Sequence, residues 1–139
     1  MIEKKRSQAS SSEKKPKEVK GILIDSKNRE VKEVLYKVVN GVNLKAVKEF
    51  VGCQTIDICR LQNGDSMYVD DEGLINGTET YFHIPKLFDQ PIAGNGLIFS
   101  VTPGGSDESY KFTTIDEVKA QIKWEGFELP QPGFEIYTF

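Results

Sequence analysis

The side chains with the greatest catalytic potential in this sequence are its single histidine, His83, and its two cysteines, Cys53 and Cys59. A cysteine–histidine pair can supply a nucleophile and its general base, and the same residue types bind zinc. The spacing of these three residues does not fit the common zinc sites, and no local nucleophile motif surrounds either cysteine. We therefore expect two reduced, buried thiols and a histidine on an edge strand. An enzyme would be indicated only if Cys59, His83 and a carboxylate lay within hydrogen-bonding reach of one another.

The densest group of oxygen ligands is the acidic run Asp70-Asp71-Glu72. It lacks the register of a calcium-binding EF-hand loop, and neighbouring residues at the end of a strand point to opposite faces. The glycine-rich segments 94–96 and 103–106 match neither the phosphate-binding loop nor the dinucleotide fingerprint. These patterns predict solvated turns, and we expect no metal and no cofactor.

The elements that must position these residues follow from apolar periodicity and turn residues. Strand-like runs are predicted over residues 21–25, 30–38, 55–60, 66–70, 81–84 and 97–101. Asn63-Gly64 favours a tight type I′ hairpin turn between two of them. Asn43 can cap a helix that ends before Gly52, and Thr114 with Glu117 forms a capping box for a helix to about Trp124. The pattern predicts an α+β domain with a small, mostly antiparallel sheet of about five to six strands and two helices.

Composition divides the 139 residues into three parts. Residues 1–18 are predicted to be a disordered basic arm, residues 19–124 the α+β domain, and residues 125–139 a C-terminal tail rich in aromatic residues and proline. Residues 1–20 carry a net charge of +4 and the remainder −7, which together give the net −3 of the chain. The acidic body argues against specific nucleic-acid binding, so only weak contact is expected, through Lys4, Lys5, Arg6, Lys14, Lys15 and Lys17.

Three short motifs carry a family resemblance: Val51-Gly52-Cys53-Gln54-Thr55-Ile56, Met67-Tyr68-Val69-Asp70-Asp71-Glu72-Gly73-Leu74 and Ala93-Gly94-Asn95-Gly96-Leu97-Ile98. In this order of elements, residues 20–124 resemble the uncharacterised family called domain of unknown function 3846. Cys53 stands where the first motif of the family has a second glycine. The resemblance implies a phage, plasmid or bacterial mobile-element setting and brings no known activity.

These observations favour a non-enzymatic accessory protein that binds and modulates another protein. The expected anchors are aromatic side chains of the C-terminal tail, namely Trp124, Phe127, Phe134, Tyr137 and Phe139. The same tail could instead fold back and cover the sheet or a neighbouring subunit. The alternative is a small-molecule binder of the nucleotide type, with Arg60, Lys86 and Phe82 as candidate contacts. Since the chain has neither an apolar signal segment nor a membrane-length apolar run, we expect a cytoplasmic protein.

Overall fold

A six-stranded antiparallel sheet forms the centre of the protein, for which the computed structural model describes residues 16–72 and 80–125. β2 (Lys17–Asp25) pairs with β3 (Glu30–Val38), and β4 (Ile56–Arg60) pairs with β5 (Ser66–Asp70). β8 (Gly96–Val101) pairs with both β2 and β5 and so joins the two hairpins. The strand order is therefore β3-β2-β8-β5-β4, with the short β9 (Asp107–Glu108) paired to β8.

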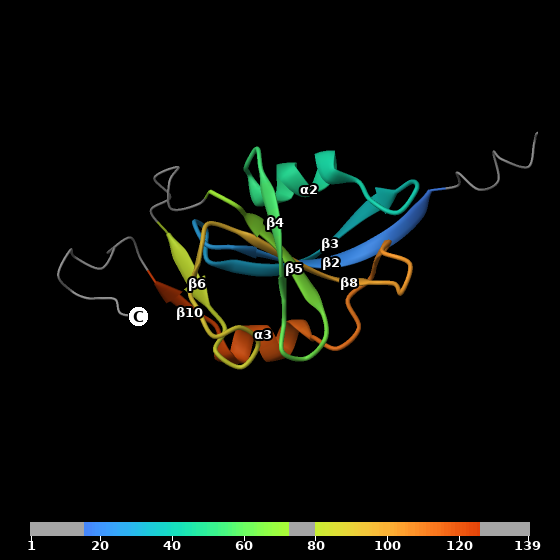
Figure 1. The fold of residues 1–139 in the computed structure, drawn as a ribbon. Helices are drawn as coiled ribbons and strands as arrows, with labels where there is room; N and C mark the ends of the chain where they lie inside the picture. The colour runs from blue at the N-terminus through green and yellow to red at the C-terminus, as the bar shows by residue number, and fades with distance from the viewer. Residues whose placement is uncertain (1–15, 73–79, 126–139) are drawn as a thin grey trace, which may run out of the picture.

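The two helices in the described part of the chain lie on opposite faces of this sheet (Figure 1). They are α2 (Leu44–Val51) and α3 (Ile115–Gln121). Alternate residues of β5 supply the two cores, since Met67 packs with the cluster on the α3 side and Tyr68 with the cluster on the α2 side. Burial on both faces explains why residues 66–69 are buried without a break.

Both predicted helix starts and the predicted glycine stop are confirmed. The Asn43 side chain accepts a hydrogen bond from the backbone N–H of Ala46, and Gly52 ends α2 with a φ of 78°. Thr114 and Glu117 form the reciprocal capping box at the start of α3. The sequence could predict these helix caps because each depends on residues within one helical turn.

A second, three-stranded sheet corrects the predicted end of α3. It consists of β6 (Tyr81–His83), β7 (Ile92–Ala93) and β10 (Lys123–Glu125), in the order β10-β6-β7. The helix was predicted to continue to about Trp124, which is wrong, because α3 ends at Gln121 and residues 123–125 pair with β6. Trp124 lies opposite Phe82 in that register, and this long-range pairing leaves no trace in the local periodicity.

The hairpin turn between β4 and β5 also differs from its prediction. Gly64 has a φ of 107°, but Asn63 does not adopt a positive φ. The N–H of Gly64 donates to the carbonyl of Leu61, and the N–H of Leu61 donates to the carbonyl of Asp65. The loop thus has three residues, with Gly64 in the left-handed position that such loops favour, rather than the two of a type I′ turn. The Asn63 side chain donates to Thr113 and accepts a hydrogen bond from the N–H of Asp65.

The predicted α+β class, the mostly antiparallel sheet and its six strands are confirmed. The start of order was predicted at Val19, whereas β2 begins at Lys17, which pairs with Val38. Among the described residues, no helix has both the length and the apolar character needed to cross a membrane.

Candidate functional site

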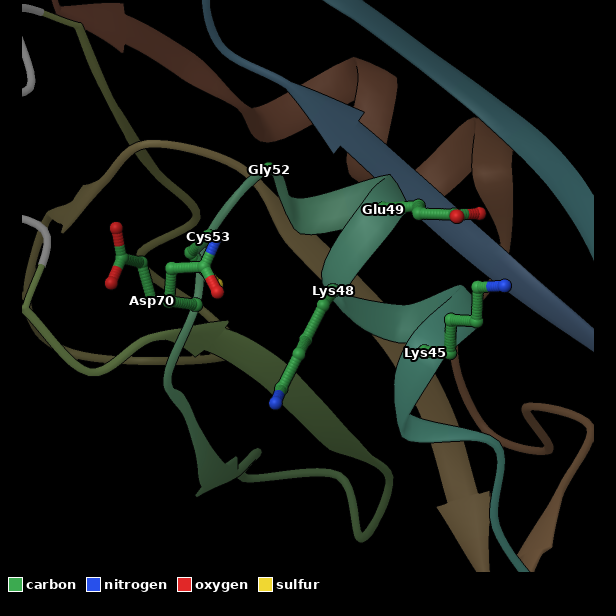
Figure 2. A pocket seen from close by; sticks show the side chains of 7 residues that line it. Lys45, Lys48, Glu49, Gly52, Cys53 and Asp70 are labelled. Carbon is green, nitrogen blue, oxygen red and sulfur yellow. The ribbon is translucent and has the colours of Figure 1, made fainter.

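Two adjoining hollows lie along α2 and its C-terminal end. The first, of about 690 Å³, is lined by Lys45, Lys48, Glu49, Gly52, Cys53, Gln54 and Asp70. Figure 2 shows Lys48 extending from α2 toward the β4–β5 hairpin and Asp70 on the other side of Cys53. The second hollow, of about 520 Å³, shares Gly52 and Asp70 with the first and continues to the turn between β2 and β3. Together they form a polar trough that bends around the end of the helix.

Gly52 forms the junction of the two hollows. Its own N–H and that of Cys53 both donate to the Lys48 carbonyl, at 2.7 and 3.2 Å, and close the helix. A Cβ atom placed on Gly52 would meet nothing within 4 Å. The helix end therefore faces open space, and glycine is there for its left-handed φ rather than for lack of room.

Ser26, Thr80 and Asn95, which line the second hollow, are held in internal hydrogen bonds. The hydroxyl of the buried Ser26 lies 2.7 Å from the hydroxyl of Thr80, and its N–H donates to the Asn95 side chain at 3.0 Å. The same Asn95 amide donates to the carbonyl of Phe50 at 3.3 Å. These contacts tie α2 to the β2–β3 turn and the β7–β8 turn, so this hollow serves the fold.

The edge of the six-stranded sheet next to the first hollow carries an exposed apolar side chain. Ile58, at the middle of β4, is 51% exposed although it pairs with the buried Tyr68. The pairing places Ile58 on the α2 side of the sheet, because directly opposed residues share a face. The helix packs on β2, β5 and β8, so β4 extends beyond its cover.

The backbone of β4 alternates between groups that face β5 and groups that face outward. Leu61 donates to Asp65, and Asp71 donates to Thr55, which fixes the odd-numbered residues as the hydrogen-bonded partners of β5. The N–H and C=O groups of Ile56, Ile58 and Arg60 consequently point away from β5. Within residues 16–72 and 80–125, β4 is the last strand on this side of the sheet. We call Lys45, Lys48, Ile56, Ile58 and Arg60 the α2–β4 shelf.

A buried carboxylate holds the hairpin that carries the shelf. Asp65 is fully buried and accepts hydrogen bonds from three successive backbone N–H groups, at 2.9 to 3.1 Å, and from two hydroxyl groups. The donors are Ser100, Lys111, Phe112 and Thr113. Burial alone would raise the pKa of Asp65, but these hydrogen bonds outweigh it and lower the pKa. These hydrogen bonds therefore hold the β4–β5 hairpin, which carries part of the shelf, in a single position.

A second buried carboxylate, Asp107, links three strands beneath α2. It accepts hydrogen bonds from the hydroxyl groups of Tyr36, at 3.0 Å, and Tyr68, at 2.9 Å. Burial raises the pKa of Asp107, and the two tyrosine hydrogen bonds and the Lys17 charge offset this only in part. The ring of Tyr68 also stacks on Phe99 with 4.2 Å between centroids. This network joins β3, β5 and β9 below the helix.

The two cysteines contact different cores. Cys53 packs with the α2-side cluster and Cys59 with the α3-side cluster, on opposite faces of the sheet. The Cys53 thiol donates to the Thr55 carbonyl at 3.3 Å, and burial raises the pKa of both thiols. Within the described part of the chain, Nε2 of His83 has no hydrogen-bond partner. Nε2 of His83 therefore makes no hydrogen bond to either thiol.

The acidic run after β5 forms a turn. The Asp70 carboxylate accepts a hydrogen bond from the Glu72 N–H at 2.8 Å, and Asp71 and Glu72 are exposed. In residues 16–72 and 80–125, no three His, Cys, Asp or Glu side chains gather as a metal site would require. The solvated turn predicted from the sequence is the arrangement observed here.

The structure describes only part of the predicted binding residues. Trp124 is half-buried in β10 against the α3-side core. The other predicted anchors and basic residues lie outside the described residues: Phe127, Phe134, Tyr137, Phe139, Lys4, Lys5, Arg6, Lys14 and Lys15. Lys17 is exposed in β2.

Of the three residues suggested for a small-molecule site, Phe82 is wrong, since its ring is 1% exposed in the α3-side core. It is the middle residue of β6, and alternation turns it inward. Arg60 and Lys86 are exposed.

Sequence reasoning missed Lys45, Lys48 and Ile58 as members of one surface. The helical pattern of residues 44–51 placed both lysines on a polar face, but only the strand order shows that β4 lies at the edge beside that face. Edge position depends on long-range pairing with β5 and β8, so no local signal marks it.

The sequence model of the family described as "Domain of unknown function (DUF3846)" matches residues 19–123, which include α2 and all of the α2–β4 shelf. No curated protein and no solved structure matches the chain.

Proposed function

We propose that this chain, which belongs to the DUF3846 family, is a non-enzymatic accessory protein that binds and modulates another protein through the α2–β4 shelf. The membership confirms the resemblance seen in the sequence. The phage or mobile-element setting implied by that resemblance is part of the proposal. The observation that carries it is Ile58, 51% exposed at the middle of an edge strand and next to a helix that bears Lys45 and Lys48.

An exposed isoleucine alone would be unremarkable, because folded proteins expose many apolar atoms. Here it coincides with backbone groups that point outward from a sheet edge. Such edges are usually covered or blocked by charged side chains, because they template pairing with other chains. A partner that covers Ile58 would remove its apolar surface from water and satisfy the outward groups of β4.

The C-terminal aromatic residues form a second part of the proposal. Phe127, Phe134, Tyr137 and Phe139 are the side-chain types that anchor protein interfaces. Trp124 contacts the α3-side core and would join the segment to the domain. Deletion of the residues after Gly126 tests this contribution in a pull-down. Retention of every partner would exclude the segment as a docking element.

The shelf itself is tested by affinity purification with Ile58→Asp. The matched control is Leu35→Asp, since Leu35 is 49% exposed on β3, the strand at the opposite edge of the sheet. Both changes place one carboxylate on an exposed edge-strand position, so their costs to folding are comparable. We expect the partner of the wild-type protein to be lost with Ile58→Asp and retained with Leu35→Asp.

The opposite pattern, or retention of the partner by both variants, would contradict binding at the shelf. Circular dichroism and thermal unfolding of each variant establish that a lost partner reflects the surface rather than the fold.

The second candidate function is the binding of a nucleotide-type small molecule in the first hollow. Its volume of about 690 Å³ suits such a ligand, and Lys45 and Lys48 are both in its lining. Lysine ammonium groups bind phosphate. A nucleotide panel that raises the unfolding temperature of the wild-type protein but not of Lys48→Ala would favour this function. No shift with any nucleotide would count against it.

A further inference from the structure

We propose that the α2–β4 shelf takes an extended, acidic segment of the partner protein, which adds to β4 as a further strand. This inference rests on the proposed function, because it specifies the partner for the same surface. Three observations carry it: the register of β4, the side chains on its α2 side and the charges along the helix.

The register fixes which backbone groups an added strand would meet. The N–H and C=O groups of Ile56, Ile58 and Arg60 point outward, as the pairing of the odd-numbered residues with β5 requires. An incoming strand would therefore pair along this edge at every second residue of β4. Its side chains would alternate between the α2 side and the α3 side of the extended sheet.

The α2 side of the edge has an apolar centre between basic groups. Ile58 lies at the middle of β4, and Arg60 is exposed at the end of the strand. Lys48 extends from α2 toward the hairpin, as Figure 2 shows, and Lys45 belongs to the same hollow. An added strand would place an apolar side chain against Ile58. Its side chains two residues away, on the same face, would reach the neighbouring basic groups.

The charges select an acidic segment. Residues 21–139 carry a net charge of −7, but the shelf contributes Lys45, Lys48 and Arg60 and no carboxylate. The carboxylates Glu49 and Asp70 line the same hollow as Lys45 and Lys48, and Asp70 lies at the opposite end of the strand pair from Arg60. The Asp57 side chain leaves β4 on the α3 side, where its register partner Val69 packs, and its carboxylate accepts a hydrogen bond from the outward N–H of Ile58. Carboxylates of the partner would thus meet the basic groups toward the Arg60 end.

The test uses a labelled peptide of sequence Gly-Glu-Thr-Val-Thr-Glu-Gly, in which the valine and both glutamates share one face of an extended strand, and its counterpart with lysine in place of glutamate. Fluorescence anisotropy at low salt measures both against the full chain. We expect the glutamate peptide to bind at least about tenfold more tightly than the lysine peptide. The double variant Lys45→Glu/Lys48→Glu should reverse this preference. The control Lys86→Glu/Lys119→Glu makes the same change in net charge away from the shelf and should keep the wild-type preference.

Strand addition makes a second, independent prediction. In an added strand, alternate peptide N–H groups face β4 and the others face away. N-methylation of one alternating set should therefore abolish binding of the glutamate peptide, and N-methylation of the other set should leave it. Equal effects of the two sets would overturn strand addition, as would the absence of binding by either peptide.

These outcomes are separable from failure of the proposed function. One outcome is that Ile58→Asp loses the natural partner while neither peptide binds, or while the two N-methylated sets have equal effects. In that case strand addition fails, and the shelf binds a protein in another way. If the partner is retained by Ile58→Asp, the proposed function fails. Tighter binding of the glutamate peptide after deletion of residues 127–139 would identify that segment as the occupant. A change in sedimentation with Ile58→Asp would identify a second copy, and either result would overturn the assignment to another protein.

Discussion

The carboxylate of Asp57 accepts a 2.8 Å hydrogen bond from the backbone N–H of Ile58, the residue that follows it on the open edge of the sheet. That N–H points away from β5 and is the one at the centre of the shelf. Asp57 therefore occupies a donor that an added strand would use, and it limits indiscriminate pairing of the edge.

Replacing Asp57 with alanine should strengthen binding at the edge. Loss of the local hydrogen bond leaves the Ile58 N–H free, and one such bond is worth about 1 kcal/mol, or about fivefold in affinity. Anisotropy titration with the glutamate peptide measures the change. Asp71→Ala removes the same charge from an exposed turn residue. An equal gain in Asp71→Ala would mean that net charge, and not the released N–H, causes the effect.

Asp65→Ala should destabilise the protein by about 3 kcal/mol or more, because it leaves several buried donors without an acceptor. Urea unfolding followed by circular dichroism measures the loss. Since the pKa of Asp65 is lowered in the folded state, its contribution is present above the unfolded-state pKa of about 3.9 and is lost as pH falls through the folded value. The difference in unfolding free energy between wild type and Asp65→Asn should accordingly shrink on acidification. A difference independent of pH would contradict the carboxylate's role.

Asp107 should show the opposite pH dependence. Its pKa is raised by burial, so its contribution is present below about pH 3.9 and declines as pH rises through the folded pKa. Wild type should therefore lose stability relative to Asp107→Asn as pH increases from 4 toward neutrality. Unfolding at a series of pH values on both proteins checks the sign. An increase in the stability of wild type relative to Asp107→Asn between pH 4 and neutrality would contradict the predicted pH dependence.

Gly64→Ala should destabilise the β4–β5 hairpin by about 1 to 2 kcal/mol. The residue has a φ of 107°, and its new Cβ would lie 3.2 Å from the Phe112 ring. Gly105→Ala is the matched control, because its φ is 93° and nothing lies within 4 Å of its Cβ. Thermal unfolding should show a larger loss for Gly64→Ala, and Phe112→Ala should remove the excess. Equal losses of stability in the two alanine variants would mean that the positive φ, and not the contact with Phe112, causes the whole effect.

The sequence predicted those parts of the fold that depend on neighbouring residues. Asn43, Gly52 and the Thr114–Glu117 capping box act within one helical turn, so the starts of both helices and the end of α2 were correct. Periodicity likewise predicted β3 and β5 at their observed bounds, and it predicted β4 with a start one residue too early, at Thr55. The end of α3 failed because Lys123 pairs with His83, forty residues earlier in the chain.

The candidate site was less predictable than the fold. No local motif marks Asp65 or Asp107, but each is buried by partners from distant segments. In the sequence, Ile58 was one apolar residue of a predicted strand. Its exposure depends on which strands α2 covers, and this is known only from the structure. Burial and edge position arise only when strands distant in sequence pair, so the residue pattern of β4 could not show that its α2 side stays open.

Residue-resolved amide hydrogen exchange of the free and partner-bound protein tests binding at β4 most directly. The N–H groups of Ile56 and Arg60 face outward, and those of Asp57 and Cys59 face β5. We predict that partner binding slows exchange at Ile56 and Arg60 by at least about tenfold and leaves the already protected Asp57 and Cys59 little changed. Unchanged exchange at Ile56 and Arg60 in the complex would contradict an added strand at this edge.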